Sequence, residues 1–330
     1  MSGGEVRVYL HVGMAKTGTT YLQNRCWANR RFLAEQGLCY PGTQRGAHFQ
    51  ASIDLRATPF VGEESTYVPG AWDEVATAAR SARDRALISH ETLARATAEQ
   101  ADRALRSLAP AQVHVVVTVR DLARQIPAVW QEMVKNRGVL GYGEFLTAIT
   151  AASPGRIGST FWLGQDVVDT LRRWTAAIPP ERVHVVTVPP AGAPRGTLWD
   201  RFCAPLGLDP RTARRDVSTV NTSMGVAQAE FLRRINPTLH RRLEWPLYAR
   251  AVKHGLVNRL AAADDAVRLR VPPDLHPWLK ERSEAMIAGL AAGGYDVVGD
   301  LADLRPVLED VPAAMPEDVG ADQLLEVCGT

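Results

Sequence analysis

The stretch Val6-Arg7-Val8-Tyr9-Leu10-His11-Val12 runs directly into Gly13-Met14-Ala15-Lys16-Thr17-Gly18-Thr19-Thr20. The first segment is apolar and rich in β-branched residues, which predicts a strand. The second carries two glycines, and a helix is expected to start near Thr19. Backbone N–H groups at such a helix start bind phosphate-like anions. We therefore predict a strand, an anion loop (residues 13–20) and a helix.

The place of the lysine distinguishes this loop from an ATP-binding loop, whose pattern is G-x-x-x-x-G-K-S/T. Gly13 and Gly18 keep that spacing, but Thr19 occupies the lysine position and the lysine lies upstream, at Lys16. The chain has only four lysines among its 38 basic residues, so a lysine here suggests a need for a compact ammonium group. We expect one tetrahedral anion to be bound by the Lys16 side chain and by the amides and hydroxyls of Thr17, Gly18, Thr19 and Thr20.

Composition narrows the class of protein. The chain has 330 residues, of which 46% are hydrophobic, enough for a full globular core. Its net charge of +2 does not favour nucleic acid or an anionic membrane as a partner. The four cysteines lack paired metal spacing and are expected to be free thiols. Since no apolar run reaches about 18 residues and no signal segment is recognisable, we expect no membrane span and a cytoplasmic location.

Strand-like and helix-like runs alternate through the first two thirds of the chain. This alternation predicts an α/β fold, a doubly wound parallel sheet flanked by helices. Strands are expected at residues 6–12, 86–89, 113–119 and 183–188. Helices are expected near residues 19–36, 72–83, 98–108, 121–136 and 166–177.

The pattern becomes helical after Pro189. A helix near 225–236 is expected to stop at Pro237, and another to cover 275–292. The Gly-rich segment 155–164 is either a mobile loop or an ordinary surface loop. Because no linker separates domains, we predict a single domain over residues 1–330. It would comprise an α/β nucleotide-binding core (1–190), a mainly helical completion (191–305) and a peripheral tail (306–330).

The ends of the predicted strands bear on metal use. Residues 113–119 run into Arg120-Asp121, and residues 86–89 run into His90-Glu91. Neither is the apolar run followed by a plain aspartate that would hold magnesium through water. A sulfuryl group carries less charge than a terminal phosphoryl group, so one ammonium and a helix N-terminus could suffice without a metal.

At this point the chain resembles the sulfotransferases that use 3′-phosphoadenosine 5′-phosphosulfate. Their loop reads Pro or Ala, Lys, Thr or Ser, Gly, then two Thr or Ser residues, and Ala15-Lys16-Thr17-Gly18-Thr19-Thr20 matches throughout. The resemblance implies a P-loop-type α/β sulfotransferase fold. It also implies that Arg120, at the end of a central strand, binds the 3′-phosphate of the donor and of the product adenosine 3′,5′-bisphosphate.

The second half of that phosphate signature is missing. The family has a serine eight residues after the arginine, and Ala128 stands there. Arg124 and Gln131 lie at helical spacings from Arg120 and Ala128 and could substitute.

The resemblance extends more weakly over most of the chain, toward bacterial, actinobacterial-like members of the family. By this resemblance the loop with Asn221 and Ser223 closes over the nucleotide; it is equally a plain helix N-cap. The segments that carry the wider resemblance are 47–49, 89–91, 120–135, 198–202 and 221–225.

A catalytic base is expected beside the loop, at the end of a neighbouring strand. Glu91 and His90 both stand there, and adjacent residues of an extended backbone point to opposite sides. The resemblance to bacterial members of the family, which have Ser-x-Glu at this place, favours Glu91, with His90 as the alternative. Glu91 could instead simply stabilise the start of the next helix. His48 is a further candidate for lining the acceptor site, and Trp130 and Trp162 stack a ring or lie in the core.

The sequence thus predicts a metal-independent sulfotransferase acting on a hydroxyl of a small molecule, carbohydrate or lipid. Two other classes remain: a P-loop small-molecule kinase, which needs a lysine where Thr19 stands, and an inactive nucleotide-binding relative. The acceptor and the oligomeric state are not encoded in any pattern we recognise.

Overall fold

The computed structural model describes residues 5–58, 67–213, 215, 217, 223–262, 267–309 and 311–329. The chain divides into two compact units. The first comprises Met1–Asp121, Leu163–Thr219 and Ser283–Arg305, and the second comprises Leu122–Trp162, Val220–Arg282 and Pro306–Thr330.

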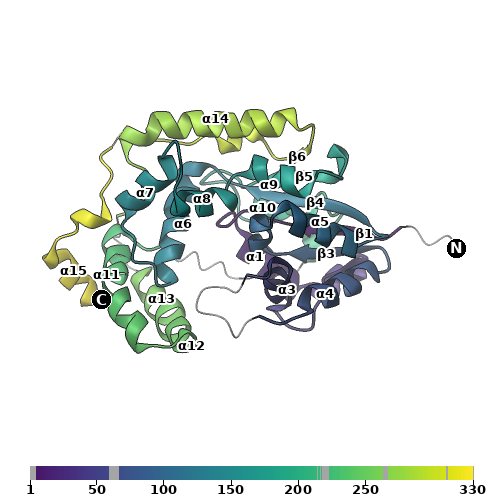
Figure 1. The fold of residues 1–330 in the computed structure, drawn as a ribbon, viewed down its shortest axis with the longest axis horizontal. Helices are drawn as coiled ribbons and strands as arrows, with labels where there is room; N and C mark the ends of the chain where they lie inside the picture. The colour runs from purple at the N-terminus through teal and green to yellow at the C-terminus, as the bar shows by residue number, and fades with distance from the viewer. Residues whose placement is uncertain are drawn as a thin grey trace. The chain divides into compact units, whose positions relative to one another are not determined.

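The first unit contains a six-stranded, all-parallel sheet in the order β2-β3-β1-β4-β5-β6 (Figure 1). This confirms the predicted doubly wound sheet, to which the short edge strands β2 and β6 are additions. β1 pairs with both β3 and β4, so the three strand ends meet at one edge. The strands are β1 (Arg7–His11), β2 (Leu38–Cys39), β3 (Arg85–Ser89), β4 (Gln112–Val119), β5 (Val183–Thr187) and β6 (Asp296–Val298).

Alternate residues of the strands point into two separate hydrophobic clusters, one on each face of the sheet. Val8 and Leu10 of β1 belong to one cluster, whereas Tyr9 belongs to the other. The first cluster is closed by α3 (Ala47–Arg56), α4 (Ala71–Arg80), α5 (Ala98–Ser107), α9 (Val167–Trp174) and part of α14 (His276–Ala292). The second is closed by α1 (Thr19–Ala28), α2 (Arg30–Glu35) and α10 (Thr197–Cys203).

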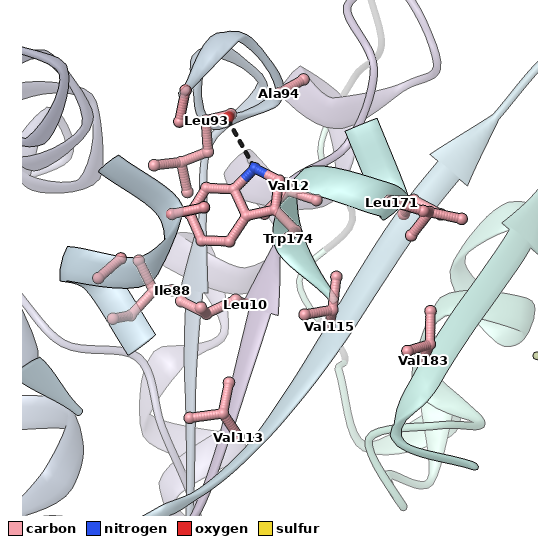
Figure 2. Packing of buried hydrophobic residues seen from close by; sticks show 14 of the residues in the cluster. Leu10, Val12, Ile88, Leu93, Ala94, Val113, Val115, Leu171, Trp174 and Val183 are labelled. Atoms are coloured by element: carbon pink, nitrogen blue, oxygen red, sulfur yellow. Dashed lines mark hydrogen bonds between the residues drawn. The ribbon is translucent and has the colours of Figure 1, made fainter. Parts of the chain in front are cut away.

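Trp174 of α9 fills the centre of the first cluster. Its side chain is fully buried, and its indole N–H donates to the carbonyl of Leu93 at 3.1 Å. Figure 2 shows the indole among Leu10, Ile88 and Val115 of three neighbouring strands. One aromatic side chain therefore fixes α9 against the middle of the sheet.

The second unit is helical in its described part. The expected helical character of the last third of the chain is confirmed, with β6 as a strand that we did not predict. None of the described helices combines the length and the apolar character needed to cross a membrane. The helices of the second unit are α6 (Leu122–Lys135), α7 (Tyr142–Thr150), α8 (Arg156–Leu163), α11 (Val226–Arg242), α12 (Trp245–Tyr248), the π-helix η5 (Ala249–Leu256), α13 (Val257–Leu260), the start of α14 and α15 (Ala321–Cys328).

The predicted stop at Pro237 is wrong, because α11 continues through it to Arg242. A proline removes one helical hydrogen bond, at a cost of about 3 kcal/mol. Tertiary contacts of the preceding residue hold the helix in place. The buried Asn236 amide donates to the carbonyls of Val134 and Gly138 and accepts from the Tyr248 hydroxyl.

Two further local expectations are corrected. The helix expected over 19–36 is interrupted at Asn29, whose side chain bonds the backbone carbonyls of Arg25 and Arg215 and the Arg215 N–H. The segment 155–164 is mostly the helix α8 rather than a loop. Its Gly158 serves close packing, since a Cβ there would lie 2.2 Å from the Ala148 carbonyl oxygen.

The buried indole gives a test of the fold. We expect Trp174→Ala to lower the free energy of unfolding by about 3–5 kcal/mol, because it leaves a large cavity and an unpaired carbonyl. Urea denaturation of both proteins measures the difference. Arg172→Ala, at a side chain that is 81% exposed on the same helix, should change it by less than about 0.5 kcal/mol. Equal effects of the two substitutions would contradict the packing described above.

Candidate active site

The anion loop leaves β1 after His11 and enters α1 at Thr19 in an unusual backbone conformation. Lys16 has a φ of 67° and Gly18 a φ of 86°, both left-handed. A non-glycine residue seldom takes this conformation, and such outliers gather at functional sites. Left-handed residues in such loops can turn successive N–H groups toward one side and so form a concavity that binds an anion.

The N-terminus of α1 completes this concavity. Gly18 is the N-cap residue, and in the described structure no side chain caps the helix. The first N–H groups of a helix have no partner within it and carry its positive dipole end. Leu198 of α10 packs on Gly18, where a Cβ would lie 2.5 Å from the leucine Cδ2. The segment 198–202, which the resemblance had picked out, thus lies beside the loop.

Arg120 follows β4 directly and contacts the loop. One of its terminal nitrogens donates to the carbonyl oxygen of Lys16 at 3.1 Å. The residue predicted to bind the 3′-phosphate therefore also braces the left-handed lysine. The structure places Lys16, the α1 N-terminus and Arg120 together at the carboxyl ends of β1 and β4.

The hydroxyl of Thr17 does not have the role that we expected. It is buried and donates to the Met14 carbonyl at 2.6 Å, so its proton is directed into the protein rather than toward an anion. It lies 2.6 Å from the Thr118 hydroxyl as well. Only the backbone N–H of Thr17 remains a candidate donor to the anion. Thr20, in contrast, is exposed.

Glu91 follows β3 and is hydrogen-bonded to helix α1. Its Oε2 accepts from the Gln23 amide at 2.9 Å. Burial by itself would raise the pKa of Glu91, but the neighbouring His90 and the Gln23 hydrogen bond hold it below its ordinary value of 4.5. The side chain is 26% exposed, so an ionised carboxylate is accessible beside the loop.

His90 has one ring nitrogen committed to the backbone. Its Nδ1 accepts from the Thr92 N–H and caps the short helix η2 (Glu91–Arg95). Burial lowers the pKa of His90, so the neutral ring carries its proton on Nε2, 4.0 Å from the Glu91 carboxylate. In this tautomer Nε2 is a donor, which makes His90 a poorer base than Glu91.

His48 is held by the backbone on both sides. Its Nε2 donates to the Pro41 carbonyl at 2.9 Å, and its Nδ1 accepts from the Ser89 N–H at 3.2 Å. Burial lowers its pKa to about 4, so the ring is neutral. With both nitrogens engaged, His48 ties α3 to the end of β3. Phe49, the next residue, contacts the His90 ring at 5.2 Å between centroids.

Several predicted residues belong to the second unit. Gln131 is buried and pairs with both the N–H and the carbonyl of Met224, and the Ser223 hydroxyl lies 3.4 Å from the same amide. This engagement argues against Gln131 as a substitute phosphate ligand. Arg124 and Ala128 lie on the same helix, α6. Asn221 lies outside the described residues, so the expectation of a closing loop concerns a segment that the structure does not describe.

The two candidate stacking tryptophans also lie in this unit. Trp130 is fully buried and its indole donates to the Leu140 carbonyl, as a core residue does. Trp162 donates to the Ile149 carbonyl and lies edge-on to Trp278.

Gln23 is a site residue that the sequence analysis missed. It lies four residues after Thr19 on α1, so it is on the same helical face as Thr19, and its amide reaches the Glu91 carboxylate. Helical spacing from the loop could have identified it. Within the part of the chain that the structure describes, no group of three or more His, Cys, Asp or Glu side chains is placed to hold a metal ion.

No protein-family model and no curated protein matches this chain. Among solved structures it is similar to the crystal structure of a sulfotransferase from Alicyclobacillus acidocaldarius, with a TM-score of 0.50 and 15% sequence identity. The match covers 90% of this chain and 98% of that one. At this identity the likeness shows the fold: the chain has the α/β fold of a solved sulfotransferase.

Proposed function

We propose that this protein is a sulfotransferase that moves a sulfuryl group from 3′-phosphoadenosine 5′-phosphosulfate to a hydroxyl acceptor. One observation carries the proposal: Gln23 of α1, the helix whose N-terminus ends the anion loop, donates to the Glu91 carboxylate at 2.9 Å. The proposed anion site and the proposed base are therefore joined by one helix. The fold likeness and the lysine position in the loop support the same reading, in which residues 1–330 act as one domain.

Each site residue is proposed to have its own role in such a transfer. Glu91 accepts the proton of the acceptor hydroxyl as its oxygen attacks. Lys16 and the N–H groups at the start of α1 stabilise the negative charge that grows on the departing phosphate oxygen. The donor supplies a sulfuryl group activated by its bond to phosphate. Because the Lys16 ammonium and the N–H groups of α1 are already placed around the anion, the transfer is proposed to need no metal ion.

Arg120 is proposed to determine the specificity for the nucleotide donor. A guanidinium binds phosphate oxygens through two parallel hydrogen bonds, and the 3′-phosphate is what distinguishes this donor from ATP. Its contact with the Lys16 carbonyl places it beside the loop. The partner ligand that the family supplies as serine stays unassigned, since Ala128 has no polar group.

Lys16→Ala tests the loop. We expect the turnover number to fall about 10²–10³-fold, because one preorganised charge donor is lost from the transition state. Transfer from the phosphosulfate donor to a panel of sugar, phenol and glycolipid hydroxyls provides the assay. Lys280→Ala, at an exposed lysine of α14, is the matched control and should leave turnover unchanged. Full activity of Lys16→Ala would contradict the mechanism.

Calorimetry tests the donor class. We expect adenosine 3′,5′-bisphosphate to bind more tightly than ADP or ATP, with or without magnesium, and Arg120→Ala to abolish that preference. The reason is that only the bisphosphate offers a 3′-phosphate to the guanidinium. Magnesium-dependent preference for ATP would favour a kinase instead. Tight bisphosphate binding without turnover on any acceptor would favour an inactive relative.

The pH profile tests the base. A base works in its deprotonated form, so kcat/KM should fall only as the pH drops through the pKa of Glu91, which lies below 4.5. The acid side should therefore be flat from pH 8 to about 5. Glu91→Gln should lower the rate about 10²–10⁴-fold, the typical contribution of a general base. His90→Gln should lower it far less; the opposite ranking would transfer the role to His90.

A further inference from the structure

His11 is a buried polar residue directly beneath the anion loop. It ends β1, and its ring is fully buried. Its Nδ1 lies 2.7 Å from the Ser89 hydroxyl at the end of β3, and its Nε2 lies 3.2 Å from the Thr118 hydroxyl of β4. One imidazole therefore links three strands at the edge of the sheet where the loop begins.

The direction of these hydrogen bonds follows from the bond between Thr17 and the Met14 carbonyl, to which they lead. Thr17 is bonded to the Met14 carbonyl at 2.6 Å, and since a carbonyl only accepts, the Thr17 proton is used there. The 2.6 Å bond between Thr17 and Thr118 must then be donated by Thr118. With its own proton directed to Thr17, Thr118 can only accept from His11. The ring proton is therefore on Nε2.

The other ring nitrogen completes the chain. Burial lowers the pKa of His11 to about 3, so the ring is neutral and Nδ1 has a free lone pair. Nδ1 therefore accepts from the Ser89 hydroxyl. The hydrogen-bond chain runs in one direction, through Ser89, His11, Thr118, Thr17 and the Met14 carbonyl. A neutral imidazole suits this place because it offers one acceptor and one donor on opposite sides.

The hydrogen-bond chain ends inside the loop, at Thr17 and Met14 on either side of Lys16. Gly13 packs directly against His11 and Thr118, two members of that hydrogen-bond chain. A Cβ at Gly13 would lie 2.5 Å from His11 Nε2 and 2.7 Å from Thr118 Oγ1. The hydroxyl of Thr17 is thus turned away from the concavity.

We propose that His11 is a positioning residue for the anion loop. Its Nε2–H, acting through Thr118, orients Thr17 so that Lys16 and the first turn of α1 keep the conformation that binds the donor. His11 does not touch the donor. This inference rests on the proposed function, since it assigns His11 to the site that holds the phosphosulfate donor.

A matched pair of substitutions separates positioning from packing. The glutamine amide nitrogen of His11→Gln reaches the place of Nε2 and keeps a donor toward Thr118. The shorter His11→Asn reaches only the place of Nδ1 and keeps the Ser89 side. We expect the dissociation constant of adenosine 3′,5′-bisphosphate to rise about tenfold or more in His11→Asn, and to stay within about threefold in His11→Gln.

Two further variants sharpen the comparison. Combining His11→Asn with Thr17→Val should weaken binding little more than either change alone, because both interrupt one chain. His184→Gln is the control, since this histidine is also buried on the same sheet but bonds to His114 and Asp296. It should leave nucleotide affinity unchanged. Thermal melting confirms that each variant is folded at the temperature of the binding measurement.

The results that overturn the inference are distinct from those that overturn the function. A folded His11→Asn that binds as tightly as the unchanged protein, or equal losses in the Asn and Gln variants, would leave His11 a packing residue. If the unchanged protein binds no bisphosphate, the proposed function fails instead. In that case, nitrogen NMR of the unchanged protein still tests the hydrogen-bond chain through His11. A His11 proton on Nε2 at neutral pH supports it, and one on Nδ1 overturns it.

Discussion

β1 is hydrogen-bonded along its length to β3 on one side and to β4 on the other. This double pairing brings the loop after β1, Glu91 after β3 and Arg120 after β4 to one edge of the sheet. Parallel strands all present their carboxyl ends there, and open α/β sheets bind ligands outside those ends. Everything proposed about the chemistry depends on this register, since a slip by one residue would turn His11 and Ser89 to the opposite face.

The site is built in two layers around that edge. The outer layer is charged and accessible, with Lys16, Arg120 and Glu91 around the start of α1. The inner layer is neutral and buried, and His11, Thr118 and Ser89 belong to it. The outer groups are partly exposed, whereas the inner groups are buried and hydrogen-bonded to one another. Buried polar groups that are fully paired specify one arrangement, and this is what a preorganised anion site requires.

Sequence patterns predicted the sheet, the loop and the residues at the strand ends, because periodicity and strand-end position are local properties. They failed where a distant partner decides the outcome. Pro237 should end a helix, but Asn236 is anchored by Val134, Gly138 and Tyr248. The Thr17 hydroxyl should face the anion, but Thr118, a hundred residues away in the chain, binds it instead. The sequence assigned no role to His11, because its partners Ser89 and Thr118 lie on other strands.

The left-handed backbone at Lys16 places a strained lysine in the anion loop. A side chain in that conformation costs about 1–3 kcal/mol, and a glycine would remove the strain. Selection for a more stable chain alone would therefore favour the loss of this lysine. Under the proposed function, Lys16 serves donor binding rather than folding, so stability and activity make opposite demands on this position.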